Sequence, residues 1–155
     1  MTHATRLATV DDFAALHALY KDLVGTIEVP DGAEGQQRLA EILDHPGTSI
    51  IVAEAEDTVC AMATLHILPN MTFAGRPYAL IENVVTLQAF QGRGLGQAVM
   101  TRAAQMAWDR DVYKIMLLTG RDLGARGFYE RLGYVADEKW GMTLRRAPKR
   151  QPQVV

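Results

Sequence analysis

The residues most suited to binding or chemistry lie in one stretch that follows an apolar run, Gln91-Gly92-Arg93-Gly94-Leu95-Gly96-Gln97. Residues 97–110, which come next, lack proline and glycine and favour a helix. Glycines allow a tight turn and let a ligand approach the backbone amides. A helix that begins here offers unpaired N–H groups and the positive end of its dipole, and Arg93 adds a positive charge. The stretch therefore indicates a phosphate or pyrophosphate site.

The glycine spacing narrows the kind of site. A dinucleotide-binding fingerprint would need glycine where Gln97 stands, and a phosphate-binding NTPase loop would need Gly-Lys-Ser/Thr, which is absent. The pattern that remains is Gln91-x-x-Gly94-x-Gly96. These residues alone leave open a glycine-rich turn that binds no ligand.

Other reactive side chains give weaker signals. Cys60 lies in an apolar, strand-like run and is expected to be a core thiol rather than a nucleophile. Since the four histidines have no ligand spacing among themselves or with Cys60, we expect no metal site; they are His3, His17, His45 and His66.

Composition limits the class of protein. With 155 residues and 48% hydrophobic content, the chain is expected to form one domain over residues 1–147, followed by a flexible tail over 148–155. A formal net charge of −2 argues against a general nucleic-acid or membrane-surface binder. No secretory signal and no run of ~18 apolar residues is visible, so a cytoplasmic location is expected.

Strand and helix patterns alternate along the chain and favour an α/β class. Helices are expected over residues 9–22, 35–43 and 97–110 and in a short segment that ends at Arg131, with Gly133 as its C-cap residue. Strands are expected over 4–8, 49–55, 58–68, 78–86, 113–119, 134–136 and 140–145, and residues 69–77 read as a loop. This order predicts a mixed sheet with helices on both faces.

With that order, the Gln91 pattern resembles the acetyl-CoA-binding motif of the GCN5-related N-acetyltransferases (GNAT). Residues 127–134, Gly-Phe-Tyr-Glu-Arg-Leu-Gly-Tyr, are similar to the family's Phe-Tyr-Glu-Lys-Leu-Gly-Phe segment. Residues 81–85 and 113–115 are similar to the glucosamine-phosphate branch and to many small bacterial members of unassigned substrate. Two positions depart from the common pattern: Gln91 replaces an arginine, and Asp122 stands where an asparagine often contacts the cofactor.

The resemblance implies a single-domain α/β (α+β) fold. Its mixed, mostly antiparallel sheet would have about seven strands flanked by four helices, with a splayed parallel strand pair around the cofactor. It also implies acetyl-CoA as acetyl donor and no metal. The implied cofactor contacts are Val84, Val85, Thr86, Gln91, Gly92, Arg93, Gly94, Leu95, Gly96, Gln97, Asp122, Ala125 and Tyr129.

Two residues are candidates for catalysis. Tyr129 would be the general acid, because a phenol is protonated at neutral pH; the alternative is a half-buried core tyrosine. Glu82 would be the general base, because burial in an apolar strand would raise its pKa; alternatively it orders a loop or binds the acceptor ammonium. His66 is a weaker candidate base.

We therefore expect a cytoplasmic, acetyl-CoA-dependent N-acetyltransferase that acetylates a primary amine of a small molecule by direct attack in a ternary complex. Acetylation of a protein lysine or N-terminus and a catalytically silent acyl-CoA-binding regulatory module are the alternatives. Arg76 and Arg121 could bind an acceptor anion or face solvent. A homodimer that pairs through C-terminal strands would place Trp140 and Met142 at its edge.

Overall fold

The computed structural model describes residues 3–149 as two compact units that divide between Leu117 and Leu118. The first unit contains 3-10 turns η1 (Val10–Asp12) and η2 (Gln88–Phe90), and the second contains η3 (Arg121–Leu123). Strands of the first unit are β1 (Thr5–Leu7), β2 (Thr48–Ala55), β3 (Thr58–Leu68), β4 (Tyr78–Thr86) and β5 (Ile115–Leu117). The α-helices are α1 (Phe13–Val24), α2 (Gly32–Asp44), α3 (Thr72–Gly75) and α4 (Leu95–Trp108) in the first unit and α5 (Arg126–Arg131) in the second.

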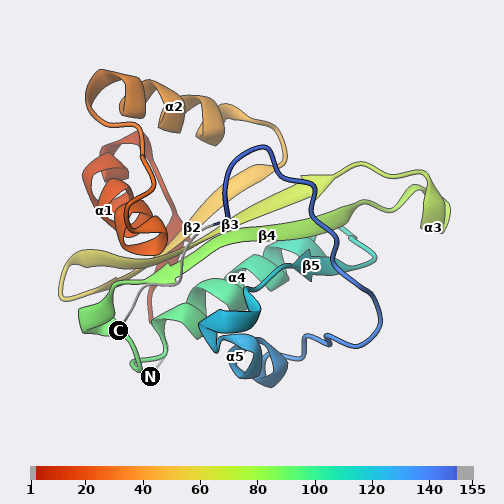
Figure 1. Cartoon of the computed structure of the whole chain (residues 1–155). Coiled ribbons are helices and arrows are strands. Elements are labelled where there is room, and N and C mark those ends of the chain that lie inside the picture. Colours follow the sequence, from red (N-terminus) through yellow and green to blue (C-terminus); the bar gives the residue numbers. More distant parts are fainter. Residues whose placement is uncertain (1–2, 150–155) are drawn as a thin grey trace. The chain divides into compact units, whose positions relative to one another are not determined.

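The five strands form one mixed sheet in the order β1-β2-β3-β4-β5. The first four strands pair antiparallel, and β4 pairs with β5 in parallel (Figure 1). Two residues, Glu56 and Asp57, connect β2 to β3, and both have positive φ, as a tight hairpin turn between right-twisted strands requires. The mixed α/β sheet expected from the sequence is confirmed.

Helices cover both faces of this sheet. In Figure 1, α1 and α2 lie over one face and α4 over the other. Leu16 and Leu19 lie three residues apart on the buried stripe of α1, and they pack with Met62 of β3. Thr9 caps the η1 turn that leads into α1, and its backbone N–H donates to the Asp12 carboxylate at 2.7 Å.

The predicted count of about seven strands and four helices is wrong. The described residues form five strands and five α-helices, and neither 134–136 nor 140–145 is a strand. Trp140 and Met142 alternate with polar residues as in a strand, but a strand also needs a partner backbone, and none of the described residues supplies one. Their side chains are 85% and 92% exposed. Pairing of two copies through this segment stays a prediction.

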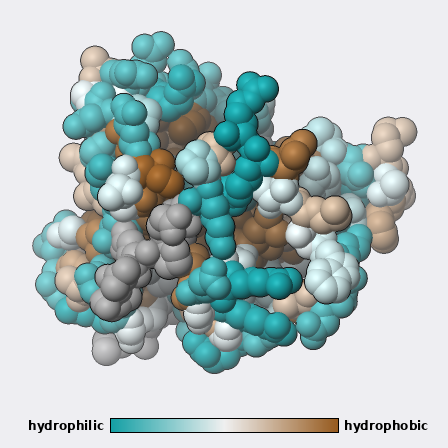
Figure 2. All heavy atoms as spheres, in the orientation of Figure 1, coloured by the Kyte–Doolittle hydropathy of each residue, from teal (hydrophilic) through white to brown (hydrophobic). Residues whose placement is uncertain are grey.

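The connection expected over residues 69–77 contains α3, a short turn in which Phe73 and Ala74 have left-handed backbone angles. Figure 2 shows hydrophobic colours at this end of the β3–β4 hairpin, where Met71 and Phe73 are exposed. Within residues 3–149, no helix combines the length and apolar character needed to cross a membrane. Of the predicted tail, residues 150–155 lie outside the described chain, and the bounds of the single domain stay a prediction.

Candidate functional site

A β-bulge interrupts β4 in the middle of the predicted site. Thr64 of β3 pairs with Glu82, and Met62 pairs with Val85, so two residues of β4 oppose one residue of β3. Asn83, one of the two, has a φ of 52°, a left-handed conformation that asparagine adopts more readily than most residues. Because paired residues share a face, the bulge turns Glu82 and Val85 to the same side of the sheet although they are three residues apart.

The bulge also lies where β4 loses its neighbour on the other side. Parallel pairing joins Ala79–Ile81 to Ile115–Leu117, the whole of β5. Beyond Ile81, β4 continues to Thr86 with no parallel partner in the first unit. Within the first unit, backbone groups of residues 82–85 on that side are therefore available to another molecule.

The glycine stretch forms the turn that opens α4, as predicted. Gly94 is the N-cap residue, with a φ of 85°, and Gly92 has a φ of 76°. Within residues 3–149, none of the backbone amides from Gly92 to Gln97 donates a hydrogen bond to another part of the chain. The first helical bond runs from the amide of Ala98 to the carbonyl of Gly94 at 3.0 Å. This row of free donors at a helix N-terminus is suited to a phosphate or pyrophosphate.

Gln91 and Thr86 join the two halves of this site. The Gln91 side-chain amide donates to the Thr86 carbonyl at 3.2 Å, which closes the connection between the end of β4 and the glycine turn. The Gln91 side chain thus positions the loop. Leu95 is buried in the core at 1% exposure, so that only its backbone faces the turn.

Arg93 is held by neighbouring groups rather than projecting alone into solvent. Its guanidinium pairs with the Glu56 carboxylate at 2.7 Å and lies 4.9 Å from the centre of the Phe90 ring. His3 contacts the backbone oxygen of Arg93 through Nε2. An exposed ion pair of this kind contributes about 0–1 kcal/mol, so a bound anion can compete with Glu56 for the guanidinium.

Three predicted site residues belong to the second unit. Asp122, in η3, accepts an ion pair from Lys149 Nζ at 3.2 Å. Ala125 is the N-cap residue of α5, and its carbonyl accepts the Tyr129 amide at 3.4 Å. Tyr129 is half-buried, with its ring edge-on to the Phe128 ring at 5.0 Å.

Glu82 is exposed, so the burial expected for it is not found. Its cross-strand partner, Thr64, is 2% exposed, and the Thr64 hydroxyl has no hydrogen-bond partner of proper geometry in the described chain. The Tyr20 hydroxyl of α1 lies beside Thr64: burial raises the pKa of Tyr20, and the nearby Thr64 hydroxyl partly offsets that effect. An acidic group and an unpartnered hydroxyl thus lie side by side on the α1 face of the sheet.

The same face carries two histidines linked by a threonine. The Thr48 hydroxyl of β2 lies 2.9 Å from His66 Nδ1 and 3.0 Å from His45 Nδ1. Thr48 and His66 are paired across β2 and β3, and His45 is the C-cap residue of α2. We call the six polar residues on this face the polar row: Tyr20, Thr64, Glu82, His66, Thr48 and His45.

The sequence over residues 10–134 matches the acetyltransferase (GNAT) family. The chain belongs to this family. GNAT membership makes the protein an N-acetyltransferase, in agreement with the resemblance seen in the Gln91 and Tyr129 segments.

Individual relatives extend this assignment. A Trypanosoma brucei brucei protein named glucosamine 6-phosphate N-acetyltransferase is 29% identical over 92 residues, which cover 59% of this chain and 61% of that protein. A presumptive acetyltransferase of Agrobacterium tumefaciens str. C58 is 42% identical in structure-based alignment, with a TM-score of 0.87 over 92% of this chain and 99% of that one. Glucosamine-6-phosphate N-acetyltransferase of Arabidopsis thaliana has a TM-score of 0.82 at 23% identity, covering 95% and 100% of the two chains, which shows the shared GNAT fold alone.

Sequence reasoning missed most of the polar row of this GNAT protein. His66 and Glu82 were candidates, whereas Tyr20, Thr64, Thr48 and His45 were not. The available signal was that Thr64 and His66 interrupt an apolar strand at alternate positions, which places both on one face. Nothing in the sequence pairs His66 with Thr48, eighteen residues earlier.

Proposed function

We propose that the protein transfers the acetyl group of acetyl-CoA to a primary amine of a small molecule. The observation that carries this proposal is the row of amides from Gly92 to Gln97 that are unpaired within residues 3–149, beside a β4 end that has no parallel partner in its unit. Such amides fit the pyrophosphate of CoA, and the open backbone of β4 fits the amide-bearing pantetheine arm.

The residues present suit each part of the chemistry. The amine nitrogen attacks the thioester carbonyl, a C–N bond forms, the C–S bond breaks, and the thiolate leaves. A backbone amide among residues 84–86 would stabilise the developing oxyanion. Tyr129 would protonate the thiolate through its hydroxyl, since a phenol holds its proton at neutral pH. Glu82 would take the amine proton through water or hold the acceptor ammonium before it is deprotonated.

A small-molecule acceptor is supported by the curated relative, whose name gives an amino sugar phosphate as its substrate. The direct test is CoA release from acetyl-CoA with a panel of amino sugars, amino sugar phosphates, polyamines and lysine peptides. Cys60 does not disturb a thiol-reagent assay, because its side chain is 0% exposed and burial raises the pKa of the thiol. Turnover of peptides alone, or CoA binding without turnover of any amine, would overturn the proposal.

Two substitutions test the assigned roles. Tyr129→Phe should lower kcat about 100-fold while CoA affinity is kept. Tyr113→Phe is the matched control, because that ring stacks on Phe73 at 4.1 Å in another part of the chain. Glu82→Gln should lower kcat if the carboxylate is the base, and raise KM for the amine if it binds the ammonium. Wild-type values of both constants would remove Glu82 from the mechanism.

A further inference from the structure

Thr48 fixes the rings of His66 and His45. Its hydroxyl carries a single proton, so Thr48 can donate to only one of the two Nδ1 atoms at 2.9 and 3.0 Å. The other ring can donate its own Nδ1–H to the Thr48 oxygen. Each ring is thereby held at Nδ1, which directs its Nε2 away from Thr48. A histidine that only packs in the fold would not need its Nδ1 atom to be held by the Thr48 hydroxyl.

His66 Nε2 has no partner among residues 3–149, and it lies on the face that carries Glu82. His66 pairs with Leu80, and Glu82 is two residues further along β4. Residues in such a diagonal relation are about 7–8 Å apart. A small molecule on this face can therefore contact the Glu82 carboxylate at one end and the His66 imidazole at the other.

Thr64 lies beside both groups, opposite Glu82 on β3 and two residues before His66. Burial of a hydroxyl without a hydrogen bond is unfavourable, and valine would fill the same space without that penalty. Thr64 is 2% exposed and unpartnered, although its neighbours on β3 are apolar. Thr64 is thus a buried polar residue behind the surface that carries Glu82 and His66, beside the Tyr20 hydroxyl of α1.

We propose that the polar row is the acceptor site and that it selects an amine carrying a second, oxygen-bearing group. The acceptor ammonium lies at Glu82, and a hydroxyl, carboxylate or phosphate oxygen binds His66 Nε2. His45 and Thr48 are positioning residues that act through His66. This inference rests on the proposed acetyl transfer and adds the substrate class.

The kinetic test compares glucosamine 6-phosphate, glucosamine and butylamine as acceptors. Thr48→Val removes the hydroxyl with little change in shape, and His66→Gln removes the imidazole. Each should raise KM for the two amino sugars at least fivefold and leave KM for butylamine, kcat and CoA affinity unchanged. The arms with and without phosphate separate an anion from a neutral hydroxyl as the preferred oxygen group.

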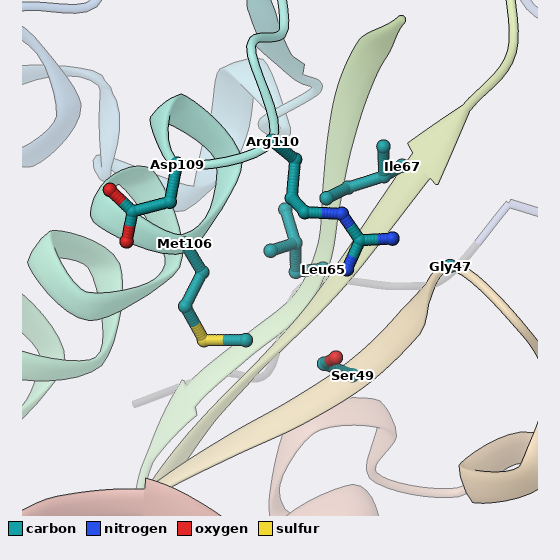
Figure 3. Close-up of a pocket in the computed structure, with 7 residues that line it drawn as sticks. All are labelled: Gly47, Ser49, Leu65, Ile67, Met106, Asp109 and Arg110. Carbon is teal, nitrogen blue, oxygen red and sulfur yellow. The ribbon is translucent and has the colours of Figure 1, made fainter.

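Ser49→Ala is the matched control. Ser49 is the next residue of β2 but points to the opposite face, where it lines a hollow of about 230 Å³ with Leu65 and Met106 beside α4 (Figure 3). It should have wild-type constants for all three amines. Equal KM values for amino sugars in Thr48→Val, His66→Gln and the wild type would overturn the proposal, as would butylamine being the better acceptor.

A readout without turnover keeps the proposal separate from the proposed function. In the CoA-bound protein, glucosamine 6-phosphate should shift the ring resonances of His66 and His45 in ¹H–¹⁵N spectra and leave those of His17 unchanged. Butylamine should shift neither. If no amine is acetylated, acetyl transfer fails while these shifts still support the binding site. If amino sugars are acetylated without any shift at His66, the site assignment fails and acetyl transfer stands.

Discussion

Tyr134 lies edge-on to Tyr129, with 6.2 Å between the ring centres, and its backbone amide donates to the Tyr129 carbonyl at 3.1 Å. The Gly133 amide donates to the Glu130 carbonyl at 3.0 Å, and Gly133 has a φ of 91°. These two bonds and the ring contact form a Schellman motif at the end of α5. The motif explains why a short helix that carries a candidate acid ends in Leu-Gly-Tyr.

Gly133→Ala should therefore destabilise the second unit. Apart from the adjacent residues, no atom of residues 3–149 lies within 4 Å of the added methyl group, so the cost comes from left-handed backbone strain, about 1–2 kcal/mol. Gly127→Ala is the control, because residue 127 is inside α5 and its new methyl group would meet only the Arg131 side chain, at 3.6 Å. That change should be neutral or stabilise by up to about 1 kcal/mol. Thermal unfolding measures both, and equal effects would contradict the capping role.

Tyr134 should make stability depend on alkaline pH. Burial, with a smaller effect of Tyr129, raises the pKa of Tyr134 from 10.0 to about 12. Between these values the unfolded chain releases the proton and the folded chain keeps it, so stability is unchanged below pH 10 and falls as pH rises toward 12. Because the ring is only partly buried, the loss at pH 11 should be about 1 kcal/mol or less. Urea unfolding of wild type and Tyr134→Phe at pH 9 and 11 isolates this loss of stability, since the variant has no hydroxyl to ionise at position 134.

Local signals allowed much of the fold to be predicted from sequence. The Thr9 cap, the leucine stripe of α1, the Glu56-Asp57 turn and the Gly94 cap all act within a few residues, and the elements they define were confirmed. The glycine turn of the candidate site was predictable for the same reason, because a helix start and positive φ are properties of the local chain.

Features that depend on distant residues could not be predicted. The apolar run around Glu82 predicted burial, but Glu82 is exposed, and the bulge at Asn83 changes which of the following side chains share its face. The contact between Thr48 and His66 exists only because the β2–β3 register places them opposite each other. The apolar alternation from Trp140 onward predicted a strand, but pairing needs a neighbouring backbone as well as a pattern.

Asp12 should make stability sensitive to acid. Arg6 donates to both Asp12 oxygens at 2.8 Å, and this contact, aided by the Thr9 amide, lowers the pKa of the carboxyl below its ordinary 3.8. The stabilisation is present above pH 3.8 and is lost as pH falls through the folded-state value. Asp12→Asn should cost about 1–2 kcal/mol at pH 7, and the difference from wild type should shrink below pH 3.

Asp11→Asn is the neighbouring control, because the structure shows no ion pair for Asp11 among residues 3–149. Chemical unfolding from pH 7 to pH 2.5 would compare the three proteins. A constant gap between wild type and Asp12→Asn over this range would show that the charge of Asp12 does not contribute through Arg6.

Glu56 should compete with the CoA phosphates for Arg93. The Arg93–Glu56 pair is exposed and weak, but an arginine released from it can turn to a neighbouring pyrophosphate without breaking another ion pair in the described chain. Glu56→Gln should therefore raise CoA affinity up to about fivefold at low salt, equivalent to about 1 kcal/mol, and the gain should shrink at 0.5 M salt because exposed charges are screened.

Asp57→Asn is the matched control: it removes the same charge from the same turn, and Asp57 makes no ion pair within residues 3–149. Calorimetric titration with CoA measures the affinity of both variants and of the wild type. An equal gain in both variants would mean that net charge, rather than release of Arg93, controls affinity, and unchanged affinity in Glu56→Gln would mean that Arg93 does not contact the phosphates.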